Sequence, residues 1–383
     1  MLKYLTAGES HGPALSMILE GMPSGVPVQT KLIADELARR RLGFGRGPRM
    51  KIERDSLELL SGVRFGLSLG SPISVVIRNS EWSKWERVMS PEPGSTRNIL
   101  TEPRPGHADL AGMLKYGFDD ARDVLERASA RETAARSAAG ALAKMLLAEL
   151  GIQVISHVVA IGTVGARRDL HPKPEDLEAI DSSQVRCFDP EAGKLMIAEI
   201  EAAEKDQDSL GGIFEVIAYG LPPGLGSYVH WDRRLDGRLA QALMSIQAIK
   251  GVEVGNGFDV AGLRGSVAHD EIFFQDGHYA RKTDRAGGTE GGVSIGGPLR
   301  VRAAMKPLST LKKPLRTVDV KTKEPAAAFK ERTDSCAVPA AGVVGEAMVA
   351  LVLADAMLEK FGGDYLDDIK SAMHAYQDRI SRS

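Results

Sequence analysis

The sequence has few of the features that mark several protein classes. It contains two cysteines, Cys187 and Cys336, in 383 residues, so neither a disulfide framework nor a cysteine metal site is expected. Aromatic residues make up 5%, and the formal net charge of −2 favours neither nucleic acid nor an anionic membrane. No apolar run reaches the length of a membrane span, and residues 1–6 lack the apolar core of a signal peptide. These absences predict a soluble cytoplasmic protein without a metal site or a membrane segment.

Glycine, in contrast, is abundant. The 41 glycines predict many tight turns, and the length allows either two domains or one large one. Residues 172–205 carry a polar helix pattern typical of a surface excursion, and residues 80–103 are irregular. Apolar spacing predicts helices at 30–42, 129–150, 233–250, 339–361 and 364–380, and strands at 2–7, 57–63, 72–78, 153–164, 212–219 and 252–258.

The stretch around Ser129 is the most informative. Ser129 and Glu132 have the spacing of a capping box at the start of a helix. Arg127 and Arg131 then lie at the helix N-terminus, where their charge opposes the dipole unless an anion binds there. His107 stands in a Pro/Gly-containing loop upstream. The pattern predicts an arginine-lined anion site beside a histidine, although a capping box by itself marks only the start of a helix.

The motif Gly-x-Ser-x-Gly occurs at residues 8–12, 66–70 and 292–296. The first copy places Ser10 beside His11, as in the nucleophile elbow of a hydrolase. An elbow usually follows several strands, whereas this copy follows the first one. Three copies favour glycine turns over a single nucleophile, so a serine hydrolase that uses Ser10 is kept only as an alternative.

The second and third copies belong to a longer repeat. Glycine, serine and proline have the same spacing in residues 66–75 as in residues 292–301. Either the two turns are alike by chance, or the chain contains two pseudo-symmetric halves, roughly 1–150 and 210–361. The second interpretation predicts one domain over residues 1–383, with a terminal helix at 364–383.

Residues 39–54 are rich in arginine and glycine. The segment is a solvated basic loop, a nucleic-acid-binding arm, or a mobile lid that closes arginines over a phosphorylated ligand. One aromatic residue and no extended repeat argue against the arm. Nucleic-acid binding by this segment is kept as a second alternative.

Later segments carry groups that suit an anionic ligand. Residues 286–292 allow close approach of a planar ligand or a phosphate, and residues 306–310 add an ammonium and two hydroxyls. Asp334 follows Arg332 and is either an ion-pair partner or a carboxylate that acts as a base. Gln247 is either a polar ligand contact or a surface residue.

In chain order, these segments resemble the chorismate synthase family. Two departures, Ala128 where many members have serine and Pro48 where many have glycine, leave the charged and proton-transferring groups in place. The resemblance implies an α/β (α+β) fold, a β-α-β sandwich with an internal pseudo-two-fold repeat, assembled as a homotetramer. It rests on residues 8–12, 45–53, 104–109, 126–133, 288–292, 306–310 and 332–335.

The resemblance also implies a reaction. The substrate, 5-enolpyruvylshikimate 3-phosphate, loses phosphate and a ring proton in an anti-1,4-elimination that gives chorismate, in the shikimate pathway to aromatic amino acids. Reduced FMN is required without net redox change. The substrate carries carboxylates and a phosphate, which suits several arginines. The sequence has no G-x-G-x-x-G nicotinamide-binding motif, which favours reduction of the flavin by an external reductase. A nicotinamide site need not use this motif, so reduction by this chain with NADPH stays open as well.

By resemblance, His11 donates a proton to the departing phosphate and His107 takes a proton from the flavin. Asp334 removes the ring proton together with the flavin N5, and Ser10 and Ser129 complete the catalytic set. The substrate-binding residues are Arg40, Arg46, Arg49, Arg104, Arg131 and Arg332. The FMN-binding residues are Arg127, Ala128, Ser129, Gln247, Ala248, Gly291, Lys306, Pro307, Leu308, Ser309, Thr310 and Arg332.

Overall fold

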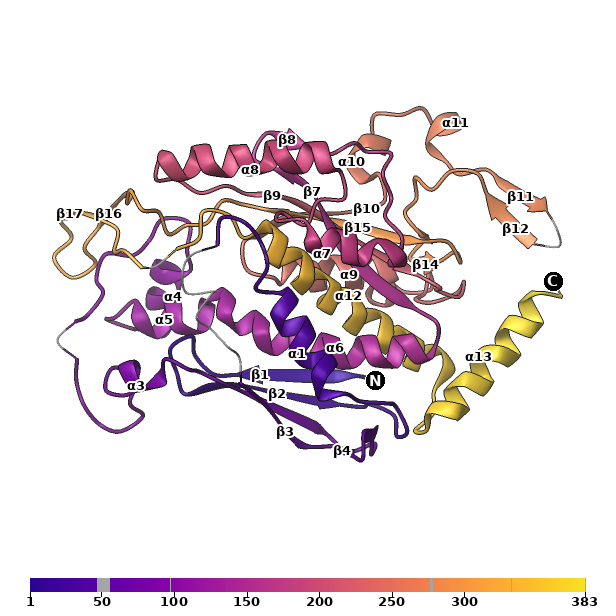
Figure 1. Ribbon diagram of the computed structural model, residues 1–383, viewed down its shortest axis with the longest axis horizontal. Helices are drawn as coiled ribbons and strands as arrows, with labels where there is room; N and C mark the ends of the chain where they lie inside the picture. Colours follow the sequence, from indigo (N-terminus) through magenta and orange to yellow (C-terminus); the bar gives the residue numbers. More distant parts are fainter. Residues whose placement is uncertain (47–55, 97, 276–277, 332, 383) are drawn as a thin grey trace.

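A layer of long helices lies between two β-sheets (Figure 1). One sheet comes from residues 3–78 and the other from residues 153–305. The helical layer includes α1 (Thr30–Arg39), α6 (Thr133–Glu149) and α12 (Val338–Phe361). This arrangement confirms the predicted β-α-β sandwich. The computed structural model describes residues 1–46, 56–96, 98–275, 278–331 and 333–382.

The first sheet is antiparallel throughout, and side chains alternate between its two faces. Leu15, Met17 and Leu19 are buried on the face that packs against α6, whereas Ile18 points outward. The strand order is β1 (Lys3–Ala7), β2 (Ala14–Glu20), β6 (Ile73–Arg78) and β3 (Ser56–Ser61).

The second sheet is also antiparallel, and its inner face packs against α12. The predicted surface excursion contributes α8 (Pro190–Lys205), which packs against β7 and β8 and buries Met196 and Ile200. The strand order is β10 (Ile249–Val254), β15 (Leu299–Met305), β9 (Gly212–Tyr219), β7 (Gln153–Ile161) and β8 (Val164–Gly165).

The two sheets share one topology. When the four main strands of each sheet are numbered along the chain, both sheets have the spatial order 1-2-4-3. The equivalent glycine turns also make equivalent hydrogen bonds. Ser68 Oγ donates to the Pro23 carbonyl at 2.5 Å, and Ser294 Oγ donates to the Pro222 carbonyl at 2.7 Å. Each hydroxyl also accepts from the N–H three residues after that proline, at 2.9 and 2.8 Å. These features support an internal repeat, while the boundaries 1–150 and 210–361 stay a prediction.

Helix α12 is the central element of the core. It packs against α6, β7, β9 and α9 (Leu235–Met244). The expectation that no run reaches the length of a membrane span is wrong for this helix, which is long and apolar enough to cross a membrane, but 89% of its most apolar window is buried inside the fold. Packing between the two sheets accounts for a helix that is apolar on all sides.

The closest approach between α6 and α12 depends on Gly140. A Cβ at this position would lie 2.2 Å from Ala347 Cβ and 2.4 Å from Ala347 Cα, so the α12 backbone would have to move. We expect Gly140→Ala to lower the free energy of unfolding by about 1–3 kcal/mol, because overpacking outweighs the better helix propensity of alanine. Urea denaturation measures this change.

Gly193 in α8 is the matched control, because it is also a buried helical glycine. A Cβ there would meet its nearest neighbours at 3.7 Å, an ordinary contact distance. Gly193→Ala should therefore stabilise the protein slightly, by roughly 0.5–1 kcal/mol from propensity alone. Equal effects at both glycines would contradict the steric explanation.

Several helix boundaries differ from the predictions, and α1 ends at Arg39 instead of residue 42. Helix α6 begins at Thr133, after the 3₁₀ turn η1 (Ala130–Glu132). Helix α9 ends at Met244 instead of residue 250, and Ala248, four residues further on, adopts φ of 68° at the turn into β10. The other elements are β4 (Val63–Arg64), β5 (Leu67–Ser68), α3 (Trp82–Trp85), α4 (Asp109–Tyr116), α5 (Arg122–Ala128), η2 (Pro174–Asp176), α7 (Leu177–Ser182), η3 (Trp231–Arg233), α10 (Gly257–Val260), α11 (Gly265–Ala268), β11 (Ile272–Gln275), β12 (His278–Arg281), β13 (Thr289–Glu290), β14 (Val293–Ser294), β16 (Arg316–Val318), β17 (Pro325–Ala327) and α13 (Leu366–Ile380).

Candidate active site

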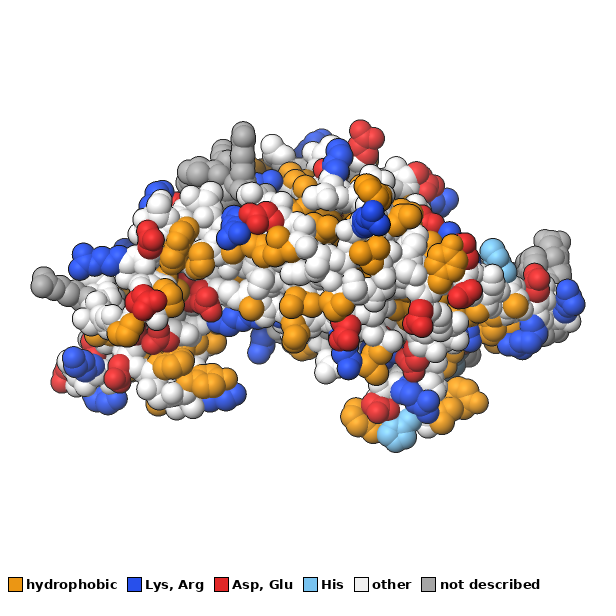
Figure 2. Space-filling model, turned by 90° about the horizontal axis from the view of Figure 1, so that it is seen from below, with side chains coloured by type: hydrophobic (Ala, Val, Ile, Leu, Met, Phe, Trp, Pro, Cys, Tyr) orange, Lys and Arg blue, Asp and Glu red, His pale blue; other side chains and the backbone are white. Residues whose placement is uncertain are grey.

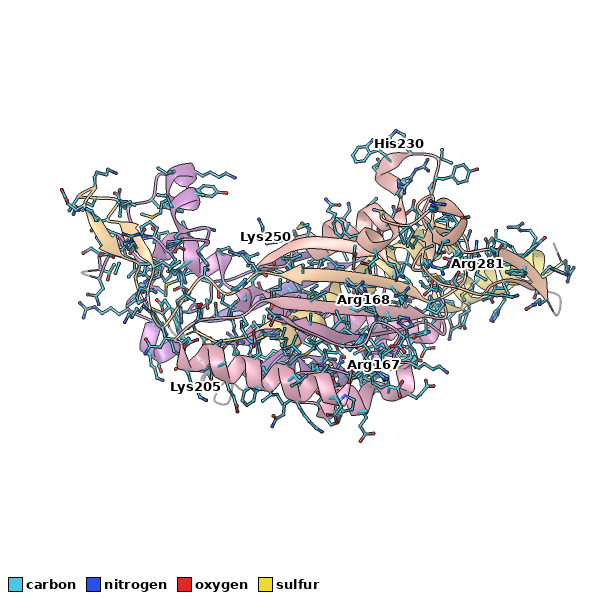
Figure 3. All side chains as sticks on the ribbon, turned by 90° about the horizontal axis from the view of Figure 1, so that it is seen from above. Arg167, Arg168, Lys205, His230, Lys250 and Arg281 are labelled. Atoms are coloured by element: carbon cyan, nitrogen blue, oxygen red, sulfur yellow. The ribbon has the colours of Figure 1, made fainter. Side chains whose placement is uncertain are left out.

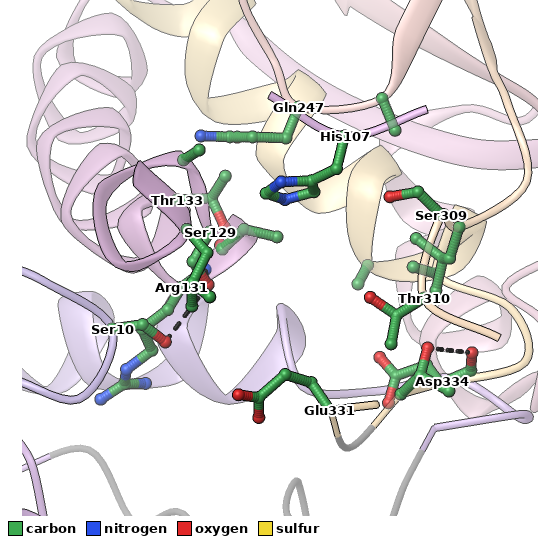
Figure 4. Close-up of a pocket in the computed structure, with 18 of the residues that line it drawn as sticks. Ser10, His107, Ser129, Arg131, Thr133, Gln247, Ser309, Thr310, Glu331 and Asp334 are labelled. Carbon is green, nitrogen blue, oxygen red and sulfur yellow. Dashed lines mark hydrogen bonds between the residues drawn. The ribbon is translucent and has the colours of Figure 1, made fainter. Parts of the chain in front are cut away.

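A cavity of about 800 Å³ brings together residues from distant parts of the chain. Figure 4 shows Ser10 and Arg131 on one side and Thr310 and Asp334 on the opposite side, with the His107 ring between them. The predicted site residues that line this cavity are Ser10, His11, Arg40, Arg46, Arg104, His107, Ala128, Ser129, Arg131, Gln247, Ala248, Lys306, Leu308, Ser309, Thr310 and Asp334.

Three of the predicted site residues that the structure describes stand apart from this lining. Arg127 faces a smaller adjoining cavity and donates to the carbonyls of Thr6 and Gly8. Pro307 and Gly291 do not line the large cavity, and Gly291 occupies the turn between β13 and β14. Arg49 and Arg332 lie outside the residues that the structure describes, so their placement stays a prediction.

His11 is held from several directions. Its Nδ1 lies 2.9 and 3.1 Å from the two carboxylate oxygens of Glu126, and its backbone N–H donates to the same carboxylate at 2.8 Å. The Trp85 ring stacks on the imidazole, with 3.8 Å between ring centroids. Burial would raise the pKa of Glu126, but hydrogen bonds and charge from His11, with help from Arg122, hold that pKa below its ordinary value. The carboxylate therefore stays ionised beside the ring.

His107 has a comparable partner. Its Nδ1 makes a short hydrogen bond with Asp109 Oδ1, and Asp109 has no exposed surface. Arg104 holds the same carboxylate through Nε at 2.8 Å and Nη2 at 3.0 Å, and it also donates to Thr310 Oγ1 at 2.8 Å. Burial opposes ionisation of Asp109, but hydrogen bonds from His107 and Arg104 outweigh it and lower the pKa to about 2.

The helix start beside Ser129 differs from the predicted capping box. Ser129 Oγ accepts from the Arg131 N–H at 3.2 Å and donates to Ser10 Oγ at 3.2 Å. Glu132, the expected second half of the box, instead accepts from Thr6 Oγ1 at 2.7 Å and from Arg136 Nε at 2.8 Å. Ser10, Ser129 and Arg131 lie together where the chain enters the 3₁₀ turn η1, which precedes helix α6.

The remaining cations approach the cavity from other elements. Arg40 is buried at the end of α1, and Arg46 Nε lies 3.2 Å from Asp334 Oδ2. Asp334 is thus an ion-pair partner in this state. Lys306 Nζ donates to the Gly106 carbonyl, and burial together with the charge of Lys250 lowers its pKa from the ordinary value. The site is strongly cationic and suits an anionic ligand.

The chorismate synthase family model matches residues 2–358. Chorismate synthases from Frankia alni and Leifsonia xyli are 63% and 61% identical to this chain; the alignments cover 98% and 100% of it, and 98% and 97% of those proteins. The chain belongs to the chorismate synthase family. A solved structure, described as a crystal structure of chorismate synthase, is similar with a TM-score of 0.81 at 43% identity, covering 100% of this chain and 99% of that one.

Chorismate synthase is a carbon–oxygen lyase of the shikimate pathway that acts on 5-enolpyruvylshikimate 3-phosphate, and the family needs reduced flavin. The predicted reaction, the loss of phosphate and a ring proton to give chorismate, is the reaction of this family. The two alternative functions are not supported.

The structure gives physical reasons against nucleic-acid binding. Within residues 39–46, Arg39 is paired with Glu346, Arg40 is buried, and Arg46 contacts Asp334. These arginines form no exposed basic surface. Basic residues elsewhere are dispersed: Lys205 of α8, Lys250 of β10 and Arg281 of β12 lie far apart (Figure 3).

Three residues that hold the two histidines had no predicted role. Glu126, Asp109 and Trp85 contact the two histidines directly. Glu126 and Asp109 belong to motifs that pointed to the family, but their pairing was not expected. Glu126 pairs with a residue 115 positions away, and such a contact leaves no periodic signal in a single sequence.

Proposed function

We propose that the cavity binds 5-enolpyruvylshikimate 3-phosphate and reduced FMN together and that its residues carry out the elimination of phosphate. The observation that supports this most is the convergence of His11, His107 and Asp334 on one arginine-lined cavity. Two proton-transferring rings and a carboxylate match a reaction that breaks one C–H bond and one C–O bond.

The arginines Arg40, Arg46, Arg104 and Arg131 are proposed to hold the substrate, and Arg49 and Arg332 keep this assignment as a prediction. The carboxylates and the phosphate of the substrate each accept paired hydrogen bonds from a guanidinium. Arg131 lies beside Ser10 (Figure 4), so we place the phosphate there, next to His11.

The residues present fit a flavin ring. Gln247 Oε1 is buried and, among the described residues, has no hydrogen-bond partner. Its Nε2 donates to Glu132 at 3.2 Å, which leaves the oxygen to accept from a ligand N–H, and flavin carries such donors. Ala128, Ser129, Ala248, Lys306, Leu308, Ser309 and Thr310 complete the proposed FMN contacts. When bound, reduced flavin supplies electron density that assists loss of phosphate and is returned at the end.

The proton transfers are assigned to individual residues. His11 donates a proton to the departing phosphate, assisted by Ser10 and Ser129. His107 accepts a proton from the reduced flavin, which keeps the cofactor electron-rich. Asp334 removes the ring proton of the substrate once a substrate anion replaces it as the partner of Arg46.

Arg46→Ala is expected to raise the KM for the substrate about tenfold or more, because a charge-assisted contact contributes roughly 1.5–3 kcal/mol. The factor by which kcat falls should be smaller than the factor by which KM rises. Asp334, the proposed base, stays in place and loses only its ion pair with Arg46. Steady-state kinetics at saturating reduced FMN measures both. Arg167→Ala removes an exposed arginine paired with Asp189 outside the cavity and should leave KM unchanged. An unchanged KM in Arg46→Ala would remove Arg46 from the substrate site.

A homotetramer is proposed as the assembled form. The outer face of the first sheet exposes Leu5, Ile18 and Leu60, and Figure 2, which views this side, shows apolar side chains among charged ones.

Gly291 lies beside Tyr228, which belongs to a projecting loop. His230 is at the tip of the same loop (Figure 3). Because Gly291 does not line the cavity of its own chain, we propose that it contacts the flavin bound to a second copy of the chain. Light scattering coupled to size exclusion tests the assembly, and a monomer would contradict it.

The source of electrons and the location are proposed as well. We assign flavin reduction to an external reductase, with NADPH as a possible electron donor to it, because the chain lacks the nicotinamide motif. Turnover with NADPH and oxidised FMN alone would instead assign the reductase activity to this chain. A cytoplasmic location agrees with the burial of α12 in the core.

An anaerobic assay tests the proposed function. Purified protein, reduced FMN and 5-enolpyruvylshikimate 3-phosphate should release phosphate and produce the diene absorbance of chorismate. Oxidised FMN without a reductant should support neither signal. Absence of phosphate release with fully reduced FMN would contradict the proposal.

A further inference from the structure

We propose that Glu126 and Asp109 are positioning residues that fix the ring nitrogens of His11 and His107, so that each histidine exchanges protons with its ligand through Nε2. This inference rests on the proposed roles of the two histidines and adds the groups that orient them. Both carboxylates are buried, and both contact Nδ1 of their histidine.

The His11 geometry defines which nitrogen carries the proton. Both oxygens of Glu126 lie within hydrogen-bond distance of Nδ1, and an ionised carboxylate only accepts. Nδ1 must therefore be the protonated nitrogen. The backbone N–H of His11 binds the same carboxylate, and the Trp85 stack restrains the ring face. Proton exchange with a ligand is then assigned to Nε2.

The His107 geometry leads to the same result. Asp109 Oδ1 and Arg104 Nη2 both lie near Nδ1, and the same Nη2 lies 3.3 Å from Nε2, but a guanidinium only donates. Of the two, only Asp109 can accept the Nδ1 proton. Arg104 meanwhile binds the Asp109 carboxylate through its side chain and through its backbone N–H at 3.1 Å. The carboxylate is locked in place, and it locks the imidazole in turn.

The fold supplies a matched control. His157 Nε2 lies 3.3 Å from Glu215 Oε2, and both residues are buried in the second sheet. Neither residue lines the cavity. Glu215→Gln therefore removes a carboxylate from a buried histidine that has no proposed part in the reaction.

Double-mutant kinetics in the anaerobic assay tests the proposal. We expect Glu126→Gln and Asp109→Asn each to reduce kcat about tenfold to a hundredfold with little change in KM, because a wrongly oriented or wrongly protonated ring remains. In a His11→Ala background, Glu126→Gln should change kcat by less than about twofold. In a His107→Ala background, Asp109→Asn should likewise change kcat by less than about twofold. Glu215→Gln should leave kcat at the wild-type value.

Several outcomes would overturn the proposal. Losses that multiply in the double variants would mean that the carboxylates act independently of the histidines. Wild-type kcat in Glu126→Gln would remove its positioning role. If Asp109→Asn does not fold, ¹⁵N imidazole shifts of the wild-type protein decide the case: Nδ1 should be protonated in both rings, and a bare Nδ1 would refute the assignment. Full activity in the single His11→Ala variant would instead contradict the proposed function.

Discussion

Replacing His11 by alanine is expected to reduce kcat by roughly 10²–10⁴-fold, the usual contribution of a positioned acid or base. The imidazole is the group proposed to protonate the departing phosphate, and it is buried between Trp85 and Glu126. KM should change little, because the arginines that hold the substrate remain. His107→Ala should cause a loss of the same order. Steady-state assays with reduced FMN measure both variants.

The controls separate chemistry from folding. His374, an exposed residue of α13, is replaced by alanine in parallel and should retain wild-type kcat. Circular dichroism and thermal melting should show that His11→Ala and His107→Ala keep the native fold. Wild-type turnover in either variant would remove that histidine from the reaction, whatever its partner carboxylate does.

Glu346→Ala should have the largest effect on stability, a loss of about 3–5 kcal/mol, because it removes the fully buried carboxylate that Arg39, Lys144 and Arg186 share. The three cations would keep only the more exposed carboxylates of Glu36 and Asp181. Glu346 has no exposed surface, and its carboxylate binds Arg39 at 2.7 and 2.9 Å and Arg186 at 3.2 Å. Lys144 contacts it too, and Ser156 donates to it at 2.6 Å. Urea denaturation at neutral pH measures the change in the free energy of unfolding.

Glu359 is the matched control on the same helix. It is half exposed and pairs with Arg238 at 2.8 Å, so Glu359→Ala should cost at most about 1 kcal/mol. Burial opposes ionisation of Glu346, but Arg39, Lys144 and Arg186 outweigh it and depress its pKa well below the ordinary value. Its contribution is therefore present above the unfolded-state pKa and is lost as pH falls through the folded-state value. A similar loss in both variants would contradict the role of the buried network.

Local patterns in the sequence predicted most of the fold. Apolar spacing located α12 and strand β1 to within one residue, and glycine-serine spacing located the two equivalent turns. The end of α9 was mistaken because Ile246 and Ile249 continue the helical spacing. The helix nevertheless ends at Met244, and the chain turns into β10 with a positive φ at Ala248.

Long-range pairings could not be predicted in the same way. Arg39 lies in the last turn of α1, yet it binds Glu346, 307 residues further along the chain. The ion pair between Arg46 and Asp334 was likewise not expected. Such contacts depend on how the layers stack, whereas periodicity reports only the structure within one segment.

The place of α12 in the chain has a consequence for biosynthesis. This helix contacts both α6 and the strands β7 and β9, but it is made almost last. Until it leaves the ribosome, the apolar faces of α6 and of the second sheet have no covering partner and are open to chaperones or to aggregation. The emerging chain therefore gains its native core late, and with it the side of the cavity that Ala337, Ala340 and Val344 provide.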